Sequence, residues 1–290
     1  MASAPEPDPV RRGARKRRRF RHFGRSGPPL RGEDRRRVGL AWGVHAFTAS
    51  GAVVGAIALL AVVAGNLPQA AVLMIVALAI DSVDGTLARA VRVGEVLPGI
   101  DGRRLDDIVD YLNYVIVPIV FLVAAGYLGP WIAALPILAS AYGFSQQDAK
   151  TDDDFFLGFP SYWNVIALYV WLLDVTPLAA TLVVTLFAIG VFVPLKYVYP
   201  SKMPVLRSAT NVAGGLWVVL ITIAVVAPNL AQRIRLAELT LAYPAWYLLL
   251  SFRYGGLSRP PPDPPRNQPS SNGSSRKGSG SNRQLLASNR

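Results

Sequence analysis

The chain has 290 residues, of which 52% are hydrophobic, and it contains no cysteine. That hydrophobic share is too high for an ordinary soluble domain with two polar ends. The lack of cysteine excludes disulfides and thiolate metal sites, so a metal would have to be held by oxygen atoms or by the two histidines. Oxygen ligands favour a hard cation such as Mg²⁺ or Mn²⁺.

The formal net charge of +12 comes largely from the chain ends. Residues 1–37 hold 13 Lys or Arg and four Asp or Glu. A basic run can bind nucleic acid, but beside a membrane helix it more often sets topology and contacts anionic lipids. We therefore expect residues 1–37 to be a disordered, basic cytoplasmic tail that contacts an anionic lipid surface, and we expect no nucleic-acid partner.

Between Val38 and Phe252 the apolar residues gather in runs of about 17 to 25, the length a helix needs to cross a bilayer. Gly, Pro and Asn separate the runs. Residues 38–252 are therefore predicted to form one transmembrane catalytic domain. The predicted fold is an all-α, polytopic bundle of about eight transmembrane helices, at 38–64, 67–90, 104–126, 130–147, 159–175, 177–195, 208–227 and 235–252.

An even number of spans places both termini on one side of the membrane. Most basic residues of the loops, such as Arg103 and Lys196, fall on the side of the N-terminal tail, whereas the opposite loops carry only Arg233 and Arg235. The positive-inside rule then places both termini in the cytoplasm. Residues 253–290 are rich in Pro, Ser and Gly and are predicted to be a disordered cytoplasmic tail.

Four aspartates flank the loop between the second and third predicted helices. Asp81 and Asp84 are three residues apart, and Asp106 and Asp110 are four apart, so each pair lies on one helix face. The alternative interpretation, that these aspartates are ordinary loop carboxylates paired with nearby arginines, does not explain this ordered spacing. Four adjacent charges would repel unless some are protonated or divalent cations neutralise them, and two Mg²⁺ or Mn²⁺ ions would do so with oxygen ligands alone.

The order of these residues resembles the signature of the CDP-alcohol phosphatidyltransferases: Asp81-x2-Asp84-Gly85-x2-Ala88-Arg89, then Gly102-x3-Asp106-x3-Asp110. The spacer of twelve residues, 90–101, is longer than in the family's common form and is similar to that of the bacterial phosphatidylcholine synthases. Two further stretches, 44–51 and 150–164, resemble the same subfamily. The likeness covers about 38–252 and implies an eight-helix fold in the bacterial inner membrane.

The resemblance implies CDP-diacylglycerol and choline as substrates and a tendency to form a homodimer. It also implies two divalent cations, Mn²⁺ or Mg²⁺, bound by Asp81, Asp84, Asp106 and Asp110. Asp110 would in addition be the general base that takes the proton of the choline hydroxyl, so that phosphatidylcholine and CMP form. The implied CDP-binding residues are Asp81, Asp84, Gly85, Ala88, Arg89 and Gly102.

Choline carries a quaternary ammonium group, for which aromatic faces and a carboxylate are natural hosts. The aromatic residues expected near the cytoplasmic ends of the third to fifth helices are Tyr111, Tyr114, Tyr142, Tyr162 and Trp163. Each could instead anchor a helix at the membrane interface. A functional role also stays open for His45, although a lone histidine in an apolar helix is usually hydrogen-bonded to a neighbouring helix, and for Asp152–Asp154.

Two other functions remain compatible with these patterns. The acceptor alcohol could be serine, inositol or glycerol 3-phosphate, with the same chemistry at the donor. Clustered aspartates among eight helices would also suit a cation-coupled transporter, but such a carrier does not need Gly85, Ala88, Arg89 and Gly102 in fixed order.

Overall fold

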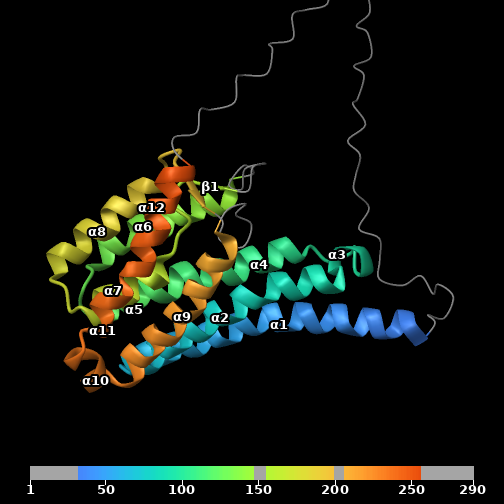
Figure 1. Cartoon of the computed structure of the whole chain (residues 1–290), viewed down its shortest axis with the longest axis horizontal. Helices are drawn as coiled ribbons and strands as arrows, with labels where there is room; N and C mark the ends of the chain where they lie inside the picture. The colour runs from blue at the N-terminus through green and yellow to red at the C-terminus, as the bar shows by residue number, and fades with distance from the viewer. Residues whose placement is uncertain (1–31, 147–154, 199–205, 256–290) are drawn as a thin grey trace, which may run out of the picture.

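The computed structural model describes residues 32–146, 155–198 and 206–255, which are mostly helical (Figure 1). The predictions for most of the N-terminal tail, for nearly all of the C-terminal tail and for Asp152–Asp154 lie outside these residues. Helices occur at all eight predicted positions, although several differ in length from the prediction.

The first two helices form an antiparallel pair, which Figure 1 shows in blue and cyan. Helix α1 spans Gly32–Val63 and α2 spans Leu67–Val91. The turn between them uses Gly65 at φ +75°, and Asn66 caps α2 by accepting a hydrogen bond from the backbone N–H of Gln69. Helix α1 begins before the predicted residue 38, because Arg35–Arg37 continue the helix beyond the apolar run.

The third predicted helix is a continuous rod of three segments: α4 (Gly102–Asp110), the π-helix η1 (Tyr111–Ile116) and α5 (Val117–Ala124). A short helix, α3 (Val93–Val96), lies in the loop before it. Asp101 caps α4 by accepting a hydrogen bond from the backbone N–H of Arg104 at 3.2 Å. The π-helix starts directly after Asp110, and short π-helical segments are frequent at functional sites.

The remaining helices are shorter. They are α6 (Pro130–Ser145), α7 (Trp163–Leu172), α8 (Pro177–Gly190), α9 (Arg207–Val226), α10 (Pro228–Arg233), α11 (Leu236–Thr240) and α12 (Ala242–Tyr254). The eighth predicted helix, 235–252, is thus divided into α11 and α12. Helices α6, α8 and α10 begin with proline, which suits the first helical turn because its nitrogen needs no hydrogen-bond partner there.

One small sheet was not predicted. Strand β1 (Phe155–Leu157) pairs antiparallel with β2 (Lys196–Val198), with Phe156 opposite Tyr197. The Ser251 hydroxyl of α12 accepts a hydrogen bond from the backbone N–H of Val198, which fixes α12 beside this sheet.

Four helical segments in the described part of the chain are long and apolar enough to cross a membrane: Asp34–Val63, Leu67–Val91, Gly102–Ala124 and Arg207–Val226. Helices α6, α7 and α8 are apolar but shorter. On α8 the side chains of Leu178, Leu182 and Leu186 are each more than half exposed. An exposed row of leucines at this spacing suits contact with lipid.

The main hydrophobic core is formed by buried residues of α1, α2, η1, α5, α6, α7, α8, α9 and α12. Phe121, Leu168 and Ile221 are fully buried there, and the ring of Phe121 packs edge to face against Trp171 at 5.8 Å. The carboxylates lie elsewhere, between α2 and the α4–η1 rod, so the core supports the rod that carries the second pair of aspartates.

Candidate active site

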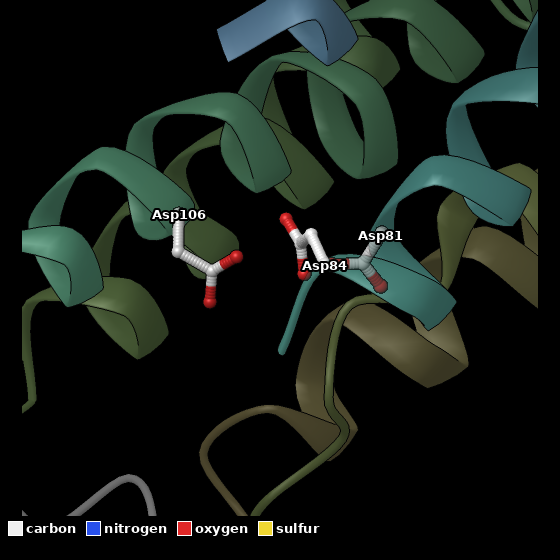
Figure 2. Close-up of side chains that lie close together, drawn as sticks. All are labelled: Asp81, Asp84 and Asp106. Carbon is white, nitrogen blue, oxygen red and sulfur yellow. The ribbon is translucent and has the colours of Figure 1, made fainter. Parts of the chain in front are cut away.

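Three of the four signature aspartates converge. The carboxylates of Asp81 and Asp84 on α2 and of Asp106 on α4 each provide an oxygen atom, and these atoms lie within 4.8 Å of one another. Figure 2 shows the side chain of Asp106 facing those of Asp81 and Asp84 from the opposite helix. Asp84 is almost fully buried, whereas Asp81 and Asp106 are partly exposed.

The fourth aspartate lines the same region. Asp110 shares a pocket with Asp81 and Asp84, one turn of helix beyond Asp106. The helix α1 forms another wall of this pocket through Thr48 and Gly51. The structure therefore brings all four aspartates to one place.

Helix α1 approaches the aspartates closely because it carries small residues at the contact. A Cβ atom at Gly51 would lie 2.8 Å from Cγ1 of Val109, and one at Gly55 would overlap the side chain of Asn113. The Asn113 amide donates a hydrogen bond of 3.0 Å to the backbone oxygen of Gly51. One turn earlier, Thr48 lines the same pocket as Asp84.

The residues expected to bind the nucleotide make different contacts near the carboxylates. Arg89 is exposed, and its Nη2 donates a hydrogen bond of 3.0 Å to the Thr86 hydroxyl. Gly85 lies beside Arg89, since a Cβ atom there would be 3.4 Å from Nη1 of the arginine. Ala88 packs against the small apolar cluster formed by Ala41, Val44 and Val93.

Gly102 packs against α1. A Cβ atom at this position would lie 3.1 Å from Cε1 of His45. The His45 side chain is 8% exposed, and its Nε2 has no hydrogen-bond partner among the described residues. His45, for which the sequence left a functional role open, therefore lies directly against Gly102 of the signature.

The five expected choline-contacting aromatics separate into two groups. Tyr114 lines the aspartate pocket, and its ring lies 6.1 Å from that of Tyr162. The other three make separate contacts: the Tyr111 hydroxyl donates to the backbone oxygen of Ile137, Tyr142 is half exposed beside Phe192, and Trp163 is fully buried with its Nε1 bonded to the Ser140 hydroxyl.

Comparison with known proteins gives a consistent result. The chain is 46% identical over 175 residues to the phosphatidylcholine synthase of Legionella pneumophila, covering 58% of this chain and 68% of that protein. It is 41% identical over 179 residues to the phosphatidylcholine synthase of Borreliella burgdorferi (59% and 75%) and 42% identical over 192 residues to that of Legionella bozemanae (62% and 88%). No protein-family model matches the chain.

The chain belongs to the phosphatidylcholine synthase family. The resemblance read from the aspartate spacing is thereby confirmed. Together with the long apolar helices, family membership makes this a multi-pass membrane protein.

The donor set of the family site fits a divalent cation. The converging side chains offer carboxylate oxygens, and the bordering Thr48 and Tyr114 add hydroxyl oxygens. Carboxylates this close together favour a positive counter-charge or protons. Oxygen-only sites of this kind suit Mg²⁺ or Mn²⁺.

Sequence reasoning missed three residues that border the site in this family member. Thr48 and Asn113 line the pocket, and Tyr247 of α12 packs edge to face against Tyr162 at 5.9 Å. Thr48 lies three residues after His45 and three before Gly51. Helical spacing therefore places it on the same face of α1 as these two residues, and this could have indicated its position at the site. The residues around Tyr247 in the sequence do not indicate a place near the site, because Tyr162, which it contacts, is 85 residues away.

Proposed function

We propose that this protein transfers the phosphatidyl group of CDP-diacylglycerol to choline, giving phosphatidylcholine and CMP. The observation that carries the proposal is the combination of 46% identity to a phosphatidylcholine synthase with four signature aspartates gathered at one site. Neither a serine-, inositol- or glycerol 3-phosphate-dependent enzyme nor a cation-coupled transporter has comparable support.

Asp81, Asp84, Asp106 and Asp110 are the proposed ligands of two divalent cations, Mn²⁺ or Mg²⁺. When bound, such cations would neutralise the diphosphate of the donor and stabilise the charge on departing CMP. This role fits the close approach of the carboxylate oxygens, which repel one another without a counter-charge.

Asp110 is the proposed general base. Its carboxylate lines the pocket and would accept the proton of the choline hydroxyl. The choline oxygen would form a bond to the phosphorus that bears diacylglycerol, and the bond from that phosphorus to the bridging oxygen would break. The electron pair of that bond leaves with CMP, so the step needs no further reactant.

Gly85, Ala88, Arg89 and Gly102 are the proposed nucleotide-binding residues beside Asp81 and Asp84. Arg89 is exposed next to the carboxylates, and its planar guanidinium suits paired phosphate oxygens. Gly85 leaves room beside Arg89 for a flat ligand close to the backbone, whereas Ala88 and Gly102 pack against α1 and bring α2 and α4 close to it.

Tyr114 and Tyr162 are the proposed choline-contacting residues. Their rings adjoin each other beside Asp81, so a quaternary ammonium group there would meet both aromatic faces and negative charge. Tyr111, Tyr142 and Trp163 have weaker support, because their contacts lie away from the pocket.

For the whole chain we propose eight membrane-crossing helices, both termini in the cytoplasm and residence in the bacterial inner membrane. The basic N-terminal tail would contact anionic lipids, and two chains would associate as a homodimer. Cysteine labelling of engineered single-cysteine variants can test the orientation, because the natural chain has no cysteine.

The activity is tested with the purified protein in detergent micelles, CDP-diacylglycerol, Mn²⁺ or Mg²⁺ and labelled choline, with serine, inositol and glycerol 3-phosphate in parallel. We expect metal-dependent formation of phosphatidylcholine and CMP that Asp110→Asn abolishes. Asp107→Asn is the matched control, since Asp107 lies on the same helix outside the signature. Product with another alcohol alone would overturn choline as the acceptor, and no CMP with any alcohol would favour the transporter.

A further inference from the structure

One hydrogen bond joins the expected choline site to the expected metal site. The Tyr114 hydroxyl donates to Oδ2 of Asp81 at 2.7 Å. This distance is the usual one for a well-formed hydroxyl–oxygen hydrogen bond. Tyr114 is only 6% exposed, whereas Asp81 is partly exposed.

The tyrosine that makes this bond is held firmly on the π-helix η1. Neighbouring residues tie η1 to two other helices: Asn113 bonds to Gly51 of α1, and Tyr111 bonds to Ile137 of α6. The ring of Tyr114 adjoins Tyr162, whose ring in turn packs against Tyr247. The hydroxyl of Tyr114 therefore has a fixed position relative to α2.

A fixed donor on one oxygen restricts the rotation of the whole Asp81 carboxylate. Asp81 is the less enclosed of the two α2 aspartates, since Asp84 is buried and Asp81 is partly exposed. In metal sites, partners that hydrogen-bond a ligating carboxylate orient it, and their loss commonly lowers metal affinity by about 10- to 100-fold.

We propose that the hydroxyl of Tyr114 is a positioning group that orients Asp81 for binding a divalent cation. The ring of Tyr114 can still contact choline, so the ring and the hydroxyl have separable roles. This inference rests on the proposed function, because it takes Asp81 as a metal ligand.

The test measures Mn²⁺ binding to the purified full-length protein in detergent by electron paramagnetic resonance, which needs no turnover. Tyr114→Phe removes the hydroxyl and keeps the ring, and we expect the Mn²⁺ dissociation constant to rise about 10-fold or more. Tyr111→Phe is the matched control. It also removes a bonded hydroxyl from η1, but that hydroxyl donates to the backbone oxygen of Ile137 and to no aspartate of the described residues, so Mn²⁺ affinity should not change.

A double-mutant cycle with Asp81→Ala separates orientation from general damage to the fold. If the hydroxyl acts through Asp81, Tyr114→Phe weakens Mn²⁺ binding in the natural chain and adds no loss in the Asp81→Ala background. An equal loss in both backgrounds, or no loss in either, would overturn the inference.

The same measurements distinguish this inference from the function on which it depends. If the natural protein binds Mn²⁺ and Asp81→Ala weakens that binding, the metal site stands, and an unchanged affinity in Tyr114→Phe then overturns the role of the hydroxyl alone. If Asp81→Ala leaves Mn²⁺ binding unaltered, the proposed ligand set and this inference both fail.

Discussion

The side-chain amide of Asn113 donates a hydrogen bond to the backbone oxygen of Gly51, over a distance of 62 residues in the chain. Both residues line the aspartate pocket. The bond therefore joins α1 to the rod of α4, η1 and α5 at the level of Asp110, and it makes α1 a structural part of the site.

Asn113→Ala should destabilise the protein and reduce its activity. The substitution removes a buried inter-helix hydrogen bond, which contributes about 1 kcal/mol to the free energy of unfolding, and leaves space beside α1. We expect a lower thermal midpoint in detergent and a lower kcat. Ser145→Ala is the control, because its exposed hydroxyl bonds to the backbone oxygen of Ala141 in its own helix, and its midpoint should stay close to that of the natural protein.

Gly55→Ala and Gly43→Ala should have opposite effects, although both lie on α1. A Cβ atom at Gly55 would overlap Asn113 and lie 3.0 Å from Cδ2 of Leu112, so the helices must separate at a cost of about 1–3 kcal/mol. A Cβ atom at Gly43 meets nothing within 4 Å, and alanine is the better helix former by roughly 0.5–1 kcal/mol. Thermal unfolding of the two variants checks this, and equal midpoints would contradict the packing of α1 on the rod.

Gly102→Ala should lower kcat/KM for CDP-diacylglycerol by about five- to tenfold, as expected when roughly 1 kcal/mol of strain is introduced beside the site. The strain arises because the new Cβ atom would meet the ring of His45 at 3.1 Å. The double variant Gly102→Ala with His45→Ala should then be more active than Gly102→Ala alone. If the second substitution restores nothing, the glycine is required for the nucleotide itself and not for the histidine.

Tyr162→Ala should raise the apparent choline KM, whereas Tyr142→Ala should not. Loss of one cation–π contact is worth about 0.5–2 kcal/mol, which corresponds to a rise of roughly two- to thirtyfold. Tyr162 adjoins Tyr114 at the pocket, and Tyr142 is half exposed beside Phe192. Initial rates at varied choline and saturating CDP-diacylglycerol measure both constants, and equal constants for the two variants would place the choline site elsewhere.

Tyr127 should make stability depend on pH in the alkaline range. Burial raises its pKa from the usual 10 to about 12, and the hydrogen bond of 2.8 Å to the Asp174 carboxylate adds to the rise. Because the folded protein favours the protonated phenol, this contribution is complete below pH 10 and is lost as the pH rises from 10 to 12. The unfolding free energy of Tyr127→Phe should change less between pH 10 and 12 than that of the natural protein. If the unfolding free energies of the two proteins change equally with pH, Tyr127 makes no such contribution.

Much of the site was predictable because its residues follow helical spacing within a short stretch of sequence. Asp81 with Asp84, and Asp106 with Asp110, had to share helix faces, and a connecting loop of limited length had to bring those faces together. Trp163 shows the limit of this reasoning. Its predicted place near a helix end suited a ligand contact, but Trp163 is buried by Ser140 of α6 and by Phe159 in the segment just before α7.

Other features leave little trace in the sequence. Strands β1 and β2 are three residues each and pair across some 40 residues, so neither forms an alternating pattern of its own. The division of the eighth helix at Leu241 falls inside one apolar run. The π-helix η1 is equally hidden, since its sequence YLNYVI runs from the polar α4 into the apolar α5 with no Gly or Pro to mark it.

The π-helix also sets the rotational phase between two halves of one rod. Helix α4 must turn Asp106 and Asp110 toward α2, while α5 must turn Phe121 and Leu122 into the core. A wider turn lets one segment rotate relative to the other by part of a turn without a break in the chain. The face of α4 that carries Asp106 and Asp110 and the face of α5 that packs into the core can therefore each keep their own orientation. The number of residues in η1 (111–116) sets the angle between these two faces.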